Sequence, residues 1–182
     1  TTPKGWCENV QYFESEQRLG KAIQLNKLLL SAKTNFVGVV DNDVVLPVKW
    51  LLYCMEIACV KHVGSCGVLV EEHLELGKHE KVTAYNTKFY IPSKIGGAAL
   101  VWSKSKLKEL GFFRQDLGVY GHEDADFCNR LRRQGFHVAC LASRGFQLVS
   151  PNDSAVYKAW KEKVFEDGRG NALKRYDEIW ND

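Results

Sequence analysis

The stretch Phe36-Val37-Gly38-Val39-Val40-Asp41-Asn42-Asp43 decides the fold that we expect for this chain. Its first part is continuous, apolar and rich in β-branched residues, which is typical of a strand buried on both faces. Its last part is acidic, and in open α/β sheets ligands bind just beyond the carboxyl ends of strands. The stretch therefore predicts an α/β domain with a ligand site at Asp41 and Asp43.

Strand and helix patterns alternate on either side of this stretch. Further strands are expected at about residues 10–13, 66–70, 96–102 and 137–141, and helices after Ser15 and at about 48–60, 103–110, 123–135, 155–165 and 171–180. Residues 71–95 are polar and predict an edge hairpin or a mobile loop. The alternation predicts one three-layer α/β domain over residues 1–182 with a mostly parallel central sheet, in which residues 151–182 form a C-terminal helical extension.

The composition of the chain is that of a globular protein. Its 182 residues are enough for one domain with a full core, and 45% of them are hydrophobic and 26% charged. The net charge of +3 comes with no basic run, which argues against a nucleic-acid partner. No apolar run is long enough to predict a transmembrane segment.

The six cysteines form no Cys-x-x-Cys pair, which argues against a structural zinc site. Most of them lie within apolar runs and are expected to be small buried residues, with disulfides as the lesser alternative. We therefore expect a reducing compartment, with the protein in the cytoplasm, either free or peripheral to a membrane.

A second acidic cluster lies in Gly121-His122-Glu123-Asp124-Ala125-Asp126-Phe127, at the start of an amphipathic helix. Acidic residues in a first turn complement the helix dipole, and Asp126 can pair with Arg130 four residues later. Three carboxylates are more than a cap requires, however. A carboxylate at a junction between a loop and a helix is also well placed to act as a general base.

The two acidic sites together indicate two different chemical roles, metal binding at one and proton removal at the other. Asp41 and Asp43 can hold a hard divalent cation, Mn²⁺ or Mg²⁺, that bridges phosphate oxygens, although a simple turn after the strand is the alternative. A metal there would stabilise a leaving diphosphate, while a carboxylate of the second cluster removed a proton from an attacking hydroxyl.

Four segments then resemble a known family in the family's own order. They are Gly20-Lys21-Ala22 with Asn26, then 36–43 followed by Pro47 and Trp50-Leu51, then Gly96–Val101 leading to Leu110–Phe113, and finally Gly118–Gly135. Over about residues 17–142 the chain resembles family 2 and related inverting glycosyltransferases of the GT-A fold, which is Rossmann-like. The resemblance implies metal-assisted transfer of a sugar, with inversion, from a UDP- or GDP-sugar to a hydroxyl of a glycan, lipid or protein acceptor.

The resemblance also implies roles for single residues. Asp43 would coordinate the metal, and Asp41 would touch the metal or the ribose of the nucleotide. Gly97 and Ala98 would pass close to the donor sugar. Asp124 would be the general base, with Glu123 beside it to orient substrate hydroxyls.

An acceptor platform is a further hypothesis. Aromatic and imidazole rings at Trp102, Tyr120 and His122 could stack on a sugar acceptor; core packing is the alternative for Trp102 and simple exposure for the other two.

Two departures from the family pattern keep other functions open. We expect the chain to be N-terminally incomplete, without the strands that bind the nucleotide base in the family. The metal-binding histidine of many members is also missing near Gln147 or Leu148. The alternatives are a metal-dependent sugar nucleotidyltransferase or phosphohydrolase, and a non-catalytic carbohydrate-binding domain.

Overall fold

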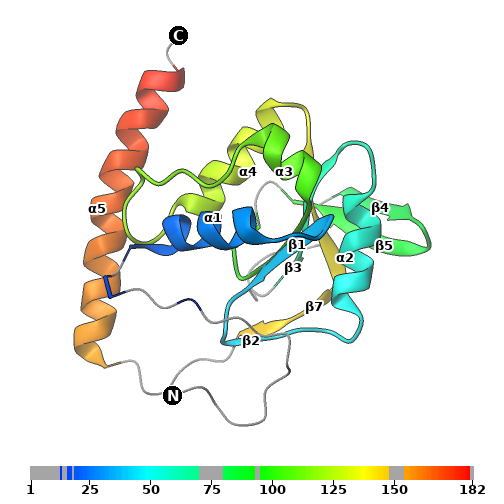
Figure 1. The fold of residues 1–182 in the computed structure, drawn as a ribbon, viewed down its shortest axis with the longest axis horizontal. Coiled ribbons are helices and arrows are strands. Elements are labelled where there is room, and N and C mark those ends of the chain that lie inside the picture. The colour runs from blue at the N-terminus through cyan, green and yellow to red at the C-terminus, as the bar shows by residue number, and fades with distance from the viewer. Residues whose placement is uncertain are drawn as a thin grey trace.

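The computed structural model describes residues 13, 16–17, 19–69, 80–92, 95–147 and 154–180. A six-stranded sheet with the strand order β1-β6-β3-β7-β5-β4 forms its centre (Figure 1). Its strands are β1 (Phe36–Val40), β3 (Val63–Leu69), β4 (Glu80–Ala84), β5 (Thr87–Ile91), β6 (Ala99–Ser103) and β7 (His137–Arg144). The short strands β2 (Val44–Val45) and β8 (Phe146–Gln147) pair separately. The helices are α1 (Lys21–Ser31), α2 (Trp50–Ala58), α3 (Lys104–Leu110), α4 (Glu123–Arg133) and α5 (Ala155–Trp180).

Two hydrophobic clusters lie on opposite faces of the sheet. Strand β6 shows the division, because Leu100 and Trp102 belong to one cluster and Ala99 and Val101 to the other, as the alternation of side chains along a strand requires. The first cluster includes side chains of α1, α3 and α4, and the second includes side chains of α2. The predicted three-layer α/β architecture is therefore confirmed.

The prediction of a mostly parallel sheet was wrong. Among the described strands, β3 and β7 pair in parallel, whereas β6 is antiparallel to β1 and β3, and β5 is antiparallel to β4 and β7. A parallel neighbour needs a long crossover, usually a helix, whereas only two residues separate β4 from β5, so this pair has to be antiparallel. The β4–β5 hairpin turns at Tyr85 and Asn86, whose φ angles of 51° and 65° suit a tight turn of the I′ type.

Several predicted elements are confirmed, with two differences. Strand β1 has the predicted limits, but it lies at the edge of the sheet and Val40 is 43% exposed, so burial on both faces was wrong. The two helices predicted after residue 154 are one continuous helix, α5. The predicted edge hairpin is present as β4 and β5, whereas the strand predicted at 10–13 and the cap at Ser15 fall outside the described residues.

The described cysteines are free thiols, and Cys59 alone among them is exposed. Among the described helices, none has both the length and the apolar composition needed to cross a bilayer.

Candidate active site

A cavity of about 300 Å³ lies at the carboxyl end of β1, where the N-termini of α1 and α4 meet the turn that leads into β6. Phe165 of α5 also lines it. The cavity is lined by Lys21, Asp41, Val68, Leu69, Gly96, Gly97, Ala98, Tyr120, Gly121, His122, Glu123, Asp124 and Phe165. Segments that are far apart in the sequence therefore meet at one place, the end of the sheet where α/β folds bind ligands.

The start of α1 brings a lysine into the cavity. Gly20 caps the helix with a φ angle of 86°, which suits glycine, and a Cβ there would lie 3.0 Å from the backbone of Val119. The N–H of Lys21 donates to the carbonyl of Val119 at 3.2 Å, so α1 begins against the loop that precedes α4.

The Lys21 ammonium is the cation of this site. Its Nζ lies 3.0 Å from Oδ1 and 3.0 Å from Oδ2 of Asp41, and 4.0 Å from Oε1 of Glu123. The helix dipole disfavours a positive charge at the start of a helix. The two carboxylates offset this cost, and the lysine in turn neutralises part of their charge.

Asp124 joins the acidic cluster to the turn before β6. Its Oδ2 accepts the N–H of Gly97 at 3.0 Å, and its Oδ1 accepts the N–H of Ala125 at 2.7 Å. A Cβ on Gly97 would lie 3.4 Å from the Asp124 Cβ, so the turn and the start of α4 are within van der Waals reach of each other. The same turn reaches β1, because the N–H of Asp41 donates to the carbonyl of Ala98 at 2.8 Å.

Glu123 is buried beside Asp124, with 7% of its surface exposed. Burial raises the pKa of Glu123 above its usual value, and the negative charges of Asp124 and Asp41 raise it further. The Glu123 backbone N–H and the Lys21 ammonium act in the opposite direction on this pKa. The site therefore contains one carboxyl whose affinity for a proton is increased.

Asp126 faces a structural partner. Its Oδ2 accepts the Arg130 Nε at 2.8 Å, which confirms the pairing predicted along the helix. The other guanidinium nitrogens of Arg130 donate to the carbonyls of Leu110 and Phe112 at 3.1 and 2.8 Å. This pair fixes α4 to the loop that follows α3.

Comparison with known proteins agrees with this geometry. Residues 4–137 match the family described as Glycosyl transferase family 2. The chain belongs to glycosyltransferase family 2. No curated protein sequence matches the chain.

Two solved structures share the GT-A fold of this family 2 domain. "Crystal structure of GalNAc-T7 with UDP, GalNAc and Mn2+" has a TM-score of 0.65 and 14% identity, and covers 85% of this chain and 36% of that one. "Mannosyltransferase PcManGT from Pyrobaculum calidifontis in complex with GDP-Man and Mn2+" has a TM-score of 0.62 and 18% identity, and covers 93% of this chain and 46% of that one. The family 2 domain thus spans less than half the length of either protein.

The cavity brings together most of the predicted site residues. It is lined by Asp41, Gly97, Ala98, Tyr120, His122, Glu123 and Asp124. Trp102 is instead fully buried, with its ring edge-on to Phe113 and Phe127, so the structure places it in the core and gives no support to its predicted acceptor role. Asp43 lies in the turn before β2 and does not line the cavity.

Lys21 and Phe165 are among the lining residues for which no role was predicted from the sequence. Lys21 belongs to the Gly20-Lys21-Ala22 segment of the family resemblance, and its positive charge in the first turn of a helix, where the dipole disfavours it, indicates a nearby anionic partner. Phe165 comes from α5, and no local pattern marks it, because its place in the cavity depends on how the helix docks.

The acidic residues offer the oxygen ligands that a divalent cation prefers. Within the described ranges, however, no three His, Cys, Asp or Glu side chains gather in a group that could hold a metal by themselves, and Asp41 is paired with Lys21. Cations such as Mg²⁺ are commonly held by one or two carboxylates together with substrate phosphates and water. The residues therefore fit a cation that is bound jointly with a diphosphate.

Proposed function

We propose that this family 2 domain transfers a sugar from a nucleotide-diphosphate sugar to an acceptor hydroxyl with inversion, and that Asp124 is its general base. The observation that carries the proposal is the contact between Asp124 and Gly97 at a cavity that also holds Asp41. One cavity thus contains a candidate base, the turn expected to line the donor sugar, and the acidic end of β1. Family membership supports the transfer reaction.

The donor side of the cavity is formed by Asp41, Gly97 and Ala98, with Lys21 between the carboxylates. Because glycine and alanine carry little side chain, a sugar ring can approach the turn closely. The Lys21 ammonium can shift from Asp41 to a phosphate oxygen, since both are anionic acceptors at short range. UDP and GDP-mannose occur in the two similar structures, and a UDP- or GDP-sugar is the donor class that we propose here.

A divalent cation, Mn²⁺ or Mg²⁺, would be held by Asp41, with Asp43 close by in the chain, and would neutralise negative charge on the leaving diphosphate. Mn²⁺ occurs in both of the similar structures.

The acceptor side is where the Asp124 carboxylate acts. Two backbone N–H groups hold its oxygens, so its orientation does not depend on substrate. A hydroxyl that enters beside it would lose its proton to the carboxylate as its oxygen bonds to the donor sugar. Glu123 is buried and has an increased affinity for a proton, so we propose that it orients a substrate hydroxyl by hydrogen bonding.

The test is turnover with a panel of UDP- and GDP-sugars, sugar acceptors, and Mn²⁺ or Mg²⁺. For Asp124→Asn we expect nucleotide release to fall by about 10²- to 10⁴-fold. Asp116→Asn is the matched control, because Asp116 pairs with Arg114 outside the cavity. Full turnover by Asp124→Asn would refute the role of the base, and a product anomer that matched the donor would refute inversion.

A further inference from the structure

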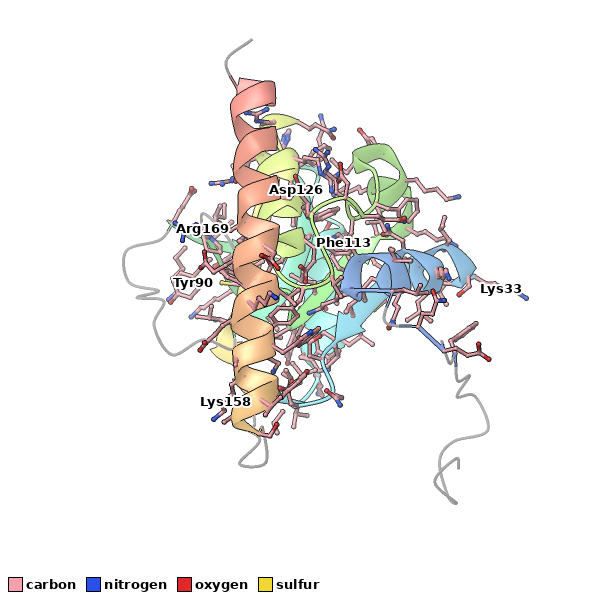
Figure 2. The ribbon with its side chains drawn as sticks, turned by 90° about the vertical axis from the view of Figure 1, so that its left-hand side faces the viewer. Lys33, Tyr90, Phe113, Asp126, Lys158 and Arg169 are labelled. Carbon is pink, nitrogen blue, oxygen red and sulfur yellow. The ribbon has the colours of Figure 1, made fainter. Side chains whose placement is uncertain are left out.

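Helix α5 touches the rest of the described structure over a narrow region. Among its residues from Ala155 to Arg169, only Gly168 is buried, although the helix has 26 residues. Figure 2 shows the outer side of this helix, along which Lys158 and Arg169 are labelled. The contact that fixes α5 therefore has to be found around Gly168.

Glycines on both sides allow the backbones to meet there. A Cβ on Gly168 would lie 2.9 Å from the carbonyl oxygen of Leu117, which is too close for any side chain. On the opposite side, a Cβ on Gly118 would lie 3.4 Å from the Gly168 Cα. The helix is thus seated directly on the loop that leads into α4.

The contact at Gly168 places Phe165, three residues earlier in α5, in the lining of the cavity. The Phe165 ring stacks on the His122 ring, with centroids 4.3 Å apart and planes 30° apart, and His122 Nε2 lies 3.1 Å from the Phe165 carbonyl oxygen. A Cβ on Gly121 would lie 2.5 Å from the ring, so only glycine leaves room for it. Phe165 remains 40% exposed and lines the same cavity as Asp124.

We propose that the Phe165 ring is the surface on which the acceptor lies, and that it takes the apolar C–H face of a pyranose. This inference rests on the proposed function, because it places the acceptor on the Asp124 side. A phenyl ring offers nothing to a phosphate, and the charged residues Lys21 and Asp41 are on the donor side. An apolar ring beside a base instead suits a substrate with one apolar face and an outward hydroxyl.

The origin of this residue matters for specificity. The family match ends at residue 137, and α5 begins at Ala155. The acidic residues and the donor turn thus come from the family segment, whereas Phe165 comes from a helix outside it. Acceptor selection would therefore be set by a segment that the family pattern does not specify.

The experiment measures sugar binding directly, with methyl glycosides of glucose, galactose, mannose and N-acetylglucosamine as probes, in the presence of UDP or GDP and Mn²⁺. Binding is followed by saturation-transfer NMR and titration. For Phe165→Ala we expect the affinity for the bound glycoside to fall about three- to tenfold, the range for one lost ring contact. Phe165→Tyr keeps the ring and should bind as wild type does.

Two further variants separate the ring from the helix. Val156→Ala changes a residue of α5 that is 80% exposed, and should leave glycoside binding unchanged. Gly121→Ala retains Phe165 but removes the room for its ring, and should reduce binding as Phe165→Ala does. Circular dichroism of each variant checks that the fold is retained, and nucleotide affinity should be the same in wild type, Phe165→Ala, Phe165→Tyr and Val156→Ala.

The inference is overturned if no methyl glycoside binds the wild-type protein, or if Phe165→Ala binds glycosides as well as wild type. An equal loss of nucleotide affinity would also overturn it, because the ring would then act on the donor side. Failure of the proposed transfer reaction has a different readout, namely absent nucleotide release from every donor.

Discussion

Replacement of Asn26 by alanine should cost a large part of the stability of the domain, although Asn26 is remote from the cavity. The Asn26 side chain is 4% exposed and bridges both backbone groups of Phe113. Its Nδ2 donates to the Phe113 carbonyl at 2.7 Å, and its Oδ1 accepts the Phe113 N–H at 3.0 Å. These bonds tie α1, which carries Lys21, to the aromatic cluster of Trp102, Phe113 and Phe127.

The magnitude follows from the two groups left behind. A buried backbone donor or acceptor without a partner costs about 1.5 kcal/mol, so Asn26→Ala should lose about 3 kcal/mol of unfolding free energy. With a urea m-value of about 2 kcal/mol/M, the unfolding midpoint should fall by about 1.5 M while m stays constant. The matched control is Gln24→Ala on the exposed side of α1, for which a change within about 0.5 kcal/mol is expected.

A second substitution tests the hydrogen bonds themselves. Asn26→Asp keeps the shape and the acceptor, but places a carboxylate oxygen against the Phe113 carbonyl. Burial and that contact should raise the pKa of the new carboxyl, so this variant should recover stability relative to wild type as the pH falls. If Asn26→Ala shifts the midpoint no more than Gln24→Ala does, the two bonds do not support the domain and the reasoning fails.

Three further predictions concern α4, the site and the sheet. Arg130→Lys cannot reach Asp126 and two carbonyls at once and should lower unfolding free energy by about 2 kcal/mol in urea denaturation, against little change for the exposed control Arg133→Lys. Burial raises the pKa of Glu123, so its contribution to stability is complete below the unfolded pKa and lost as the pH rises through the folded pKa. Glu123→Gln should therefore gain thermal stability over wild type as the pH is raised from about 4 to about 8, and an unchanged difference would contradict the shift. Gly67→Ala would place a Cβ 2.4 Å from the carbonyl oxygen of Ala99 and should lower the melting temperature far more than Gly38→Ala, where the closest atom is 3.5 Å away.

Features with a local cause could be predicted from the sequence. The short helix predicted at about residues 103–110 is present as α3, where Ser103 accepts the N–H of Lys106 and Gly111 follows the helix with a φ angle of 78°. The acidic start of α4 and its end near Gly135 follow from dipole and glycine preferences in the same way. Each of these signals acts within a few residues, so neighbours in the fold do not alter it.

Features that depend on a distant neighbour could not be predicted. The direction of β6 is set by the strands on either side of it, and the exposure of β1 by its place at the sheet edge. Trp102 and Tyr120 are both aromatic, yet one is fully buried and the other lines the cavity. The residue type does not tell whether an aromatic side chain will be buried or will line the cavity. That depends on how the helices pack against the sheet.

The loop from Leu117 to His122 explains why the cavity depends on α5. Its Val119 carbonyl accepts the first N–H of α1, its Leu117 carbonyl faces Gly168 of α5, and His122 begins α4 with a φ angle of 67°. One short segment therefore positions Lys21, Phe165 and Asp124, through its contacts with α1, α5 and α4. A change that moved α5 would act on the carboxylates through this loop, without touching them directly.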